Sequence, residues 1–153
     1  MEIKMTDDAD VVTLNQIEKF QFKVHFGGSN TELITDEPEP IGTGKGPSPD
    51  QLLAASVANC MSDSLSFALT KFKEDPSPIK TKAKAVVQRN SENRLRIAYI
   101  DVEIRLGKPI KSALYMERAL AQFESFCTVA SSVGQSLPIK VKVFDSEGNL
   151  IKG

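Results

Sequence analysis

One stretch without glycine or internal proline constrains the fold most, because it predicts a single long helix from Pro49 to about Phe72. Ser48 is a favourable N-cap, Pro49 suits the first helical position, and Gln51 completes an S-x-x-Q capping box. At ~1.5 Å per residue such a helix is about 35 Å long. Apolar residues lie on nearly all of its sides among alanines and serines, so we expect a central helix that is buried on most sides.

Alternating apolar and polar residues predict β-strands on both sides of this helix. Before the helix we expect strands over 11–26 and 31–35, followed by a loop over 36–47 that is rich in proline and glycine. After it we expect strands over 79–89, 94–106 and 139–144, and helices over 110–126 and 128–136. This order predicts one α+β domain over residues 1–153, with antiparallel sheet around one deeply buried helix.

The composition indicates an ordinary folded protein and excludes several partners. Hydrophobic residues make up 41%, charged residues 25%, and the formal net charge is −1. The positive charges are scattered along the sequence, so we expect no nucleic-acid partner. The N-terminus lacks an apolar signal segment, and no uninterrupted apolar stretch approaches the ~20 residues that span a bilayer. We therefore expect no membrane partner and a cytoplasmic location.

Residue types exclude most metal and cofactor chemistry within one chain. His25 is the only histidine, and Cys60 and Cys127 have neither CxxC nor metal-ligand spacing. Residues 42–46 lack Walker A spacing, which favours a flexible loop over a phosphate site. His25 alternates with buried strand positions and is expected to be an exposed strand residue, not a base. We expect no metal and no cofactor.

The two cysteines remain as candidates, and their positions alone leave two interpretations. Cys60, in the middle of the long helix, is either a small packing residue or a reactive thiol. Cys127 lies between two predicted helices, where a helix N-terminus would favour its thiolate, or where it simply packs. Asp50 precedes Cys60 by ten residues, about 15 Å along a helix, so it is a first-turn acid favoured by the helix dipole. A catalytic role for Asp50 needs a bridging cation.

Two segments resemble the hallmarks of the OsmC/Ohr family. In 36–65, a G-P-S-P-D loop enters the helix, and a cysteine follows the acid by ten residues. The matching positions are Gly46, Pro47, Ser48, Pro49, Asp50, Leu52, Ala54, Ala55 and Cys60. The second segment is Phe126-Cys127-Thr128-Val129, just before a short helix and a last strand. The resemblance covers most of residues 17–145.

This resemblance implies an OsmC-like fold, in which two chains form an intertwined homodimer with sheets wrapped around two central helices. It also implies a thiol-dependent peroxidase. Cys60 would attack an organic or hydrogen peroxide and become a sulfenic acid, and Cys127 would condense with it to a disulfide. A small or protein-bound dithiol would then restore both thiols. Asp50 would act at this site by holding a cation near the thiolate.

Two departures from the family pattern favour an alternative function. The peroxidases of the family use an N-terminal arginine beside the thiolate, whereas here every arginine follows Cys60, beginning with Arg89. The N-terminal cations instead are Lys19, Lys23, His25 and Lys45. Lysine lacks the planar fork that bridges a carboxylate and a thiolate, and Asp50 is one methylene shorter than the commoner glutamate. The alternative is a non-catalytic protein that binds an elongated or thiol-bearing small molecule at the dimer interface.

Overall fold

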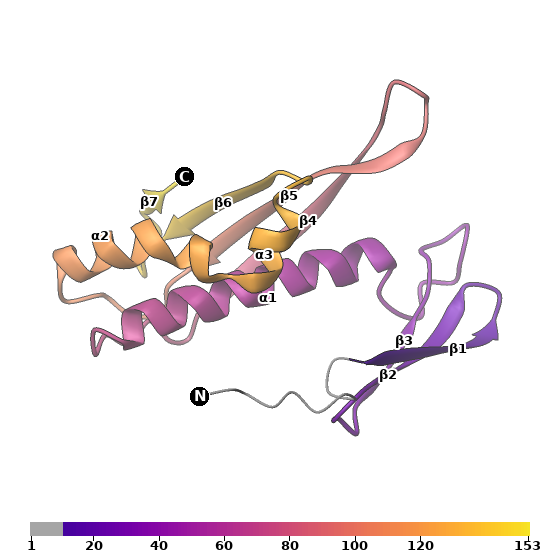
Figure 1. Ribbon diagram of the computed structural model, residues 1–153, viewed down its shortest axis with the longest axis horizontal. Helices are drawn as coiled ribbons and strands as arrows, with labels where there is room; N and C mark the ends of the chain where they lie inside the picture. Colours follow the sequence, from indigo (N-terminus) through magenta and orange to yellow (C-terminus); the bar gives the residue numbers. More distant parts are fainter. Residues whose placement is uncertain (1–10) are drawn as a thin grey trace. The chain divides into compact units, whose positions relative to one another are not determined.

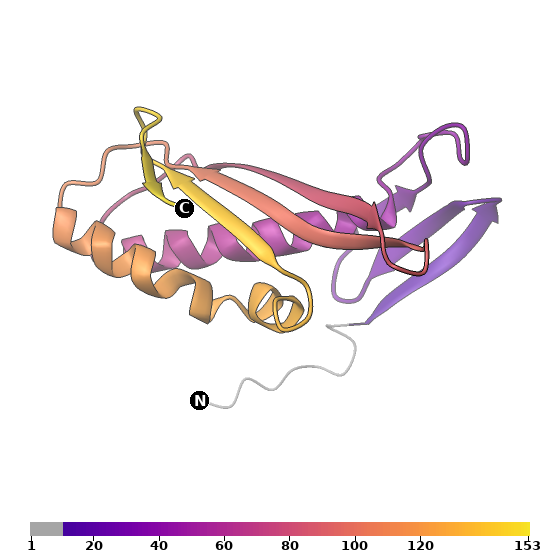
Figure 2. The ribbon, with the colours of Figure 1, turned by 90° about the horizontal axis from the view of Figure 1, so that it is seen from above.

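The structure is a computed structural model that describes residues 11–153 (Figures 1 and 2). It divides into two compact units, residues 1–52 and residues 53–153, and each is described by itself. The expectation of a single domain stays a prediction.

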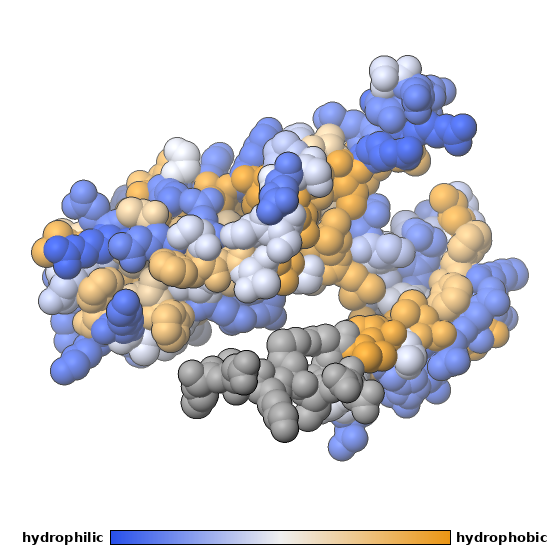
Figure 3. Space-filling model, viewed as in Figure 1, coloured by the Kyte–Doolittle hydropathy of each residue, from blue (hydrophilic) through white to orange (hydrophobic). Residues whose placement is uncertain are grey.

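The first unit contains a three-stranded antiparallel sheet, in the order β1 (Val12–Glu18), β2 (Gln21–Phe26), β3 (Glu32–Thr35). The single strand predicted over 11–26 is wrong, because the chain reverses at Lys19 and Phe20, where Lys19 has a φ of 47°. This turn has no glycine, proline or asparagine to mark it, so the alternation continues through it in the sequence. Several apolar side chains of this unit remain exposed (Figure 3): Val11, Val12, Leu14, Ile17, Phe20, Phe26, Ile34 and Ile41.

The loop after β3 is ordered around a buried carboxylate, in contrast to the flexible loop expected from its glycines. Asp36 is only 2% exposed. It accepts hydrogen bonds from the Thr43 hydroxyl at 2.6 Å and from the backbone N–H groups of Glu37, Thr43 and Lys45 at 2.8, 3.2 and 3.2 Å. These hydrogen bonds hold the pKa of Asp36 below its usual value, and the bond from the Thr43 hydroxyl has the largest effect. Because these amides already bind an internal carboxylate, they are not available to a phosphate.

Helix α1 (Pro49–Thr70) begins where the sequence predicts. The capping box is confirmed, since the Ser48 N–H donates to Gln51 Oε1 at 3.0 Å and the Gln51 N–H donates to Ser48 Oγ at 3.3 Å. The helix ends two residues before the predicted Phe72.

The second unit contains a four-stranded sheet, in the order β4 (Lys80–Arg89), β5 (Leu95–Arg105), β6 (Ile139–Phe144), β7 (Leu150–Lys152). The expectation of a purely antiparallel sheet is wrong, because β5 and β6 are parallel. Between them the chain crosses over through α2 (Ala113–Gln122), the 3₁₀ helix η1 (Phe123–Phe126) and α3 (Thr128–Val133). Such a helical crossover is what joins parallel strands. The predicted helix over 110–126 is thus α2 followed by η1, and β7 was not predicted.

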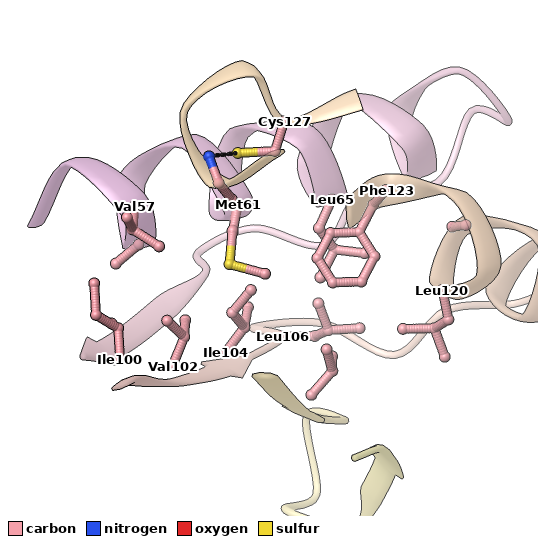
Figure 4. Close-up of a cluster of buried hydrophobic side chains, with 14 of the residues drawn as sticks. Val57, Met61, Leu65, Ile100, Val102, Ile104, Leu106, Leu120, Phe123 and Cys127 are labelled. Atoms are coloured by element: carbon pink, nitrogen blue, oxygen red, sulfur yellow. Dashed lines mark hydrogen bonds between the residues drawn. The ribbon is translucent and has the colours of Figure 1, made fainter. Parts of the chain in front are cut away.

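The core of this unit lies between α1 and the sheet (Figure 4). The buried residues of α1 recur every three or four positions, as expected for one face of a helix: Ala54, Val57, Ala58, Met61, Leu65 and Leu69. They pack with Ile100, Val102 and Ile104 of β5 and with Phe123 of η1. The sequence predicts burial on most sides of α1, but in this chain the burial is one-sided, and Phe67 is 73% exposed.

By length and average composition, α1 could also cross a membrane, with 33% of the qualifying window buried in the structure. The core helix of a globular domain has the same length and composition. These properties therefore assign no membrane role, and the absence of a membrane partner stays a prediction.

A buried glutamate ties the end of α1 to the start of α2. Glu74 accepts hydrogen bonds from the backbone N–H groups of Lys111 and Ser112, both at 3.1 Å. Ser112 is in turn the N-cap of α2 and accepts the N–H of Tyr115 at 3.3 Å. The rings of Phe72 and Tyr115 stack with centroids 4.6 Å apart. These contacts fix the direction in which α2 leads toward Cys127.

Strand pairing gathers positive charge on the face of the sheet that points away from α1. The inward residues of β5 are apolar and alternate with outward charged ones. Cross-strand partners share a face, so the outward set contains six cations and two acids: Lys80, Lys82, Lys84, Arg105, Lys140 and Lys142, with Asp101 and Glu103. We call this set the cationic face. The expectation of scattered positive charge is wrong here, because the lysines alternate along β4 and β6.

The one-sided packing of α1 predicts that Leu65→Ala is strongly destabilising. Leu65 is fully buried, so its truncation should lower the free energy of unfolding by about 3–5 kcal/mol. Leu95→Ala, at a residue 58% exposed, is the matched control and should cost less than about 1 kcal/mol. Urea denaturation at one fixed protein concentration measures both. Equal losses would contradict the assigned core.

Candidate functional site

The two cysteines of the chain lie in the second unit, on different elements. Cys60 is half-buried near the middle of α1, next to the buried Met61, and Cys127 is fully buried between η1 and α3. Both are free thiols. Figure 4 shows Cys127 beside the α1 core residues Met61 and Leu65. The crossover from β5 to β6 thus brings Cys127 back onto the helix that carries Cys60.

Backbone hydrogen bonds hold Cys127 in place as the N-cap of α3. Its backbone is extended, with φ −82° and ψ 105°, and its sulfur accepts the Ala130 N–H at 3.3 Å (dashed line in Figure 4). Its own N–H donates to the Glu124 carbonyl at 3.3 Å. This is the geometry in which a serine or asparagine would usually cap a helix. A cysteine here has its sulfur fixed at the helix start.

The surroundings of Cys127, with Cys60 among them, disfavour its thiolate. Burial, the hydrogen bond with Cys60 and the charge of Cys60 raise the pKa of Cys127 to about 11. The Ala130 N–H and the Ser64 hydroxyl act in the opposite direction but are weaker. The expectation that a helix N-terminus favours thiolate at Cys127 is therefore wrong, because desolvation prevails. Cys127 therefore keeps its proton at neutral pH.

The third predicted residue, Asp50, lies in the exposed first turn of α1. Ten helical residues place it about 15 Å along the axis from Cys60, so α1 does not bring the two together. Within residues 11–153, no ion pair to Asp50 is recorded. Asp50 therefore has the position of a first-turn acid that the helix dipole stabilises.

His25 lies on β2, with 45% of its side chain exposed, in agreement with the prediction of a surface strand residue. Its Nδ1 is 3.5 Å from Glu32 Oε1, and Lys23 Nζ is 3.5 Å from Glu32 Oε2. The Lys23 and His25 side chains therefore both lie beside the carboxylate of Glu32.

Sequence reasoning assigned no role beside the thiols to Ser64, Phe67 or Phe126, although Phe126 belongs to the second hallmark segment. Ser64 is close enough to Cys127 to act on its pKa, and it follows Cys60 by one helical turn, a spacing that the sequence does display. Phe67, two turns after Cys60 on the same side of α1, is 73% exposed, and Phe126, the neighbour of Cys127, is 72% exposed. No pattern in the sequence marks these two rings as exposed, because their burial depends on tertiary packing.

A metal site is not evident in the part of the chain that the structure describes. No three His, Cys, Asp or Glu side chains of residues 11–153 gather closely enough to bind an ion.

Comparison with known proteins places this thiol pair in a family. Residues 42–142 match the family described as OsmC-like protein, and this range contains both cysteines and all of α1. The chain belongs to the OsmC-like family. The match also agrees with the two hallmark segments in the sequence. No curated protein matches this sequence.

Solved structures of the OsmC-like kind share the fold at low sequence identity. A putative osmotic stress induced and detoxification response protein from Psychrobacter arcticus superposes with a TM-score of 0.75 at 19% identity, covering 94% of this chain and 99% of that one. An OsmC-like protein from Mycoplasma pneumoniae gives 0.75 at 14% identity, covering 92% and 99%. The organic hydroperoxide resistance protein OhrB of Bacillus subtilis gives 0.64 at 13%, covering 87% and 96%. The α+β fold with two sheets is therefore that of OsmC-like proteins.

The raised pKa of Cys127 predicts a late thiolate titration. In the reduced protein, thiolate absorbance near 240 nm should include one step with a midpoint of about 11. In Cys60→Ala the midpoint should fall, because the hydrogen bond and the charge of Cys60 no longer raise the pKa of Cys127. It should still stay above the ordinary value of 9.0, because burial is the largest cause of the shift. A Cys127 midpoint at or below 9.0 in the wild type would contradict the buried site.

The same shift gives stability a pH dependence of defined sign. The unfolded chain loses the Cys127 proton near pH 9.0 and the folded chain near 11. The stabilising contribution is thus fully present below pH 9.0 and is lost as the pH rises toward about 11. Urea midpoints in this window should fall more steeply for the wild type than for Cys127→Ala.

Proposed function

We propose that this protein is a thiol-dependent peroxidase that reduces organic hydroperoxides, and also hydrogen peroxide, in defence against oxidative stress. The observation that carries the proposal is the packing of Cys60 against the core that contains the buried Cys127, close enough to raise the pKa of Cys127, in a chain of the OsmC-like family. Family relatives named as organic hydroperoxide resistance proteins support the same chemistry. A cytoplasmic location, where thiols stay reduced, suits the cycle.

The proposed reaction uses the inequality of the two sulfurs. The Cys60 thiolate attacks the terminal peroxide oxygen, the O–O bond breaks, and the alcohol leaves with a proton while Cys60 becomes a sulfenic acid. The Cys127 thiol then attacks the Cys60 sulfur, which forms the disulfide and releases water. A dithiol reductant exchanges with this disulfide, becomes oxidised itself, and returns both thiols. Because Cys127 is protonated, it serves the second step and does not compete in the first.

Exposed apolar rings near the thiols favour an organic substrate. Phe67 lies two turns from Cys60 on the same side of α1, and Phe126 is adjacent to Cys127. Both are more than 70% exposed in the single chain. An alkyl or aryl group of a hydroperoxide can cover this surface, and burying it contributes about 25 cal/mol per Å².

We assign Asp50 a positioning role in this site, exerted through a cation. The acid at the start of α1 does not reach Cys60 along the helix. A lysine or histidine between them would stabilise the thiolate by its charge, without the bidentate geometry of arginine. This weaker activation predicts a slower peroxidase than one that has an arginine.

We further propose that the protein is a homodimer. α1 is buried on one side only, although apolar residues lie around most of it, and the first unit exposes a row of apolar side chains. Exposed apolar surface of this extent marks an interaction site. A second copy of the chain would bury the uncovered side of α1 and the exposed apolar side chains of the first unit.

The peroxidase proposal predicts a specific product of oxidation. One equivalent of cumene hydroperoxide should convert the reduced protein to an intramolecular Cys60–Cys127 disulfide, with the loss of two hydrogens by mass. Cys60→Ser should lose turnover completely, because the thiolate that attacks the peroxide is removed and the protonated Cys127 does not replace it. Cys127→Ser should stop after one turnover at the sulfenic acid, which dimedone traps. Peptide mapping and peroxide consumption measure these outcomes.

The matched control is Ser64→Ala, which leaves both thiols in place and should retain the disulfide product. Two free thiols after peroxide treatment would sink the mechanism. Peroxide consumption that persists in Cys60→Ser would do the same.

The dimer proposal predicts a molar mass of twice 16.7 kDa in sedimentation equilibrium. Leu14→Lys places a charge among the exposed apolar residues of β1 and should shift the equilibrium toward the monomer. Lys23→Gln on β2 is the control and should leave the mass unchanged. A wild-type mass of 16.7 kDa at micromolar concentration would refute the dimer.

A second candidate function is non-catalytic binding of an elongated or thiol-bearing molecule at the dimer interface. The observation in its favour is the absence of any arginine before Arg89. It predicts ligand binding that Cys60→Ser abolishes without any peroxide consumption in the wild type.

A further inference from the structure

The cationic face carries positive charge that nothing in the described chain neutralises by direct pairing. The ion pairs recorded for residues 11–153 join Lys23, His25, Lys108 and Lys152 to their acids, and involve none of the six cations on this face. Lys140 lies over the Tyr99 ring, with Nζ 3.7 Å from its centroid. Six cations against two acids leave this face strongly positive on a chain whose net charge is −1.

A cavity of about 420 Å³ is present at one end of this face. It lies over β4, β5 and β6 and is bounded by the turn before β7, with the lining Lys80, Thr81, Lys82, Glu103, Ile104, Arg105, Phe144 and Gly148. Its volume falls within the range of about 300–1,000 Å³ that small-molecule sites occupy. The charged side chains therefore surround a space large enough for a small organic ligand.

The register of the sheet sets the order of groups in this cavity. Lys80 pairs with Arg105, and Arg105 pairs in turn with Phe144 on β6, so a row of two cations and one aromatic ring crosses three strands. Lys82 and Glu103 form the next pair along. Cross-strand neighbours are about 5 Å apart. One end of the cavity is thus cationic and the other apolar.

Arg105 is held in position by the β6–β7 turn. Its Nη2 donates to the Ser146 carbonyl at 3.1 Å, and the guanidinium lies against Gly148, where no side chain intervenes. A guanidinium has five N–H donors in a planar fork, so most of them remain available to a ligand. Because the turn already holds the Arg105 side chain, this side chain loses little conformational freedom when an anion binds.

We propose that this cavity binds a small organic phosphate monoester. Lys80, Lys82 and Arg105 supply three positive charges and Glu103 one negative charge, so the site carries a net charge of about +2. A phosphate monoester carries about −1.5 to −2 at pH 7 and would be neutralised there. Phe144 offers its ring to the organic part of the ligand. Lys84, Lys140 and Lys142, beyond the cavity, raise the local concentration of anions.

This site is independent of the thiols and of the proposed peroxidase function. The inward residues Val102 and Ile104 pack with α1, whereas Glu103 and Arg105 point to the opposite face of β5. Loss of Cys60 therefore leaves the cavity intact, and loss of Arg105 leaves the thiol pair intact.

Calorimetric titration of the full chain with phenyl phosphate tests the proposal. Phenyl phosphate should bind saturably, at one site per chain, and more tightly than inorganic phosphate or phenol, because each of these probes supplies only one of the two contacts. Benzoate, with a single charge, should bind more weakly than phenyl phosphate. Affinity should fall as salt rises.

Four variants change the charge of the face in a predicted pattern. Arg105→Gln should weaken phenyl phosphate binding about tenfold or more, because a charge-assisted contact is lost. Glu103→Gln should instead tighten it severalfold, because the only acid in the cavity is removed. Lys84 lies on β4 with Lys80 and Lys82, on the same face of the sheet but outside the cavity. Lys84→Gln should therefore change the affinity for phenyl phosphate less than about twofold. Lys80→Gln, whose side chain makes no recorded hydrogen bond or ion pair, repeats the Arg105 test without disturbing the turn.

Thermal unfolding and the Cys127 titration serve as fold controls for each variant. Absence of saturable binding would overturn the proposal. An affinity for inorganic phosphate equal to that for phenyl phosphate would also overturn it. The same holds if Glu103→Gln binds phenyl phosphate more weakly than the wild type, or if Lys84→Gln loses as much affinity as Lys80→Gln.

Discussion

The packing of one side of α1 against β5 is the interaction on which the second unit depends. Val57, Met61 and Leu65 of α1 are buried together with the apolar residues of β5, and Phe123 closes the core from the crossover. Each such side chain contributes about 1.5–3 kcal/mol when buried. The same packing decides where chemistry can occur, because Cys60 lies at the edge of the buried stripe and is half-exposed while its neighbour Met61 is fully buried.

Burial also makes the two sulfurs chemically different. Cys127 is inside the core that stabilises the unit, so its thiolate is disfavoured even though it caps a helix and accepts an N–H. Cys60, at the boundary, can be reached from outside. The burial that stabilises the core therefore also raises the pKa of Cys127. A helix N-terminus lowers a thiol pKa only where burial or a neighbouring negative charge does not outweigh it, and here desolvation is the stronger effect.

Local signals in the sequence predict local structure correctly. The capping box at Ser48 and Gln51 sets the start of α1, and alternation sets β4 and β5 to within about a residue. The reversal at Lys19 carries no turn residue and is missed. The parallel pairing of β5 and β6 is missed as well, because it depends on the path of the crossover. Of the candidate site, the hallmark segments single out the two cysteines in the sequence, but they do not indicate that burial raises the pKa of Cys127.

By itself the sequence determined the family and most of the helices and strands, because helix caps, strand alternation and motif spacing are encoded over short distances. Only the tertiary structure decided what these residues do to one another. It brought Cys127 onto α1, where desolvation raises its pKa, whereas Asp50 lies ten residues before Cys60, in the first turn of the same helix. It also aligned the lysines of β4 and β6 with Arg105 on one face, since strand register is set by pairing between segments far apart in the chain. Burial and charge clustering are properties of that pairing, and no single segment contains them.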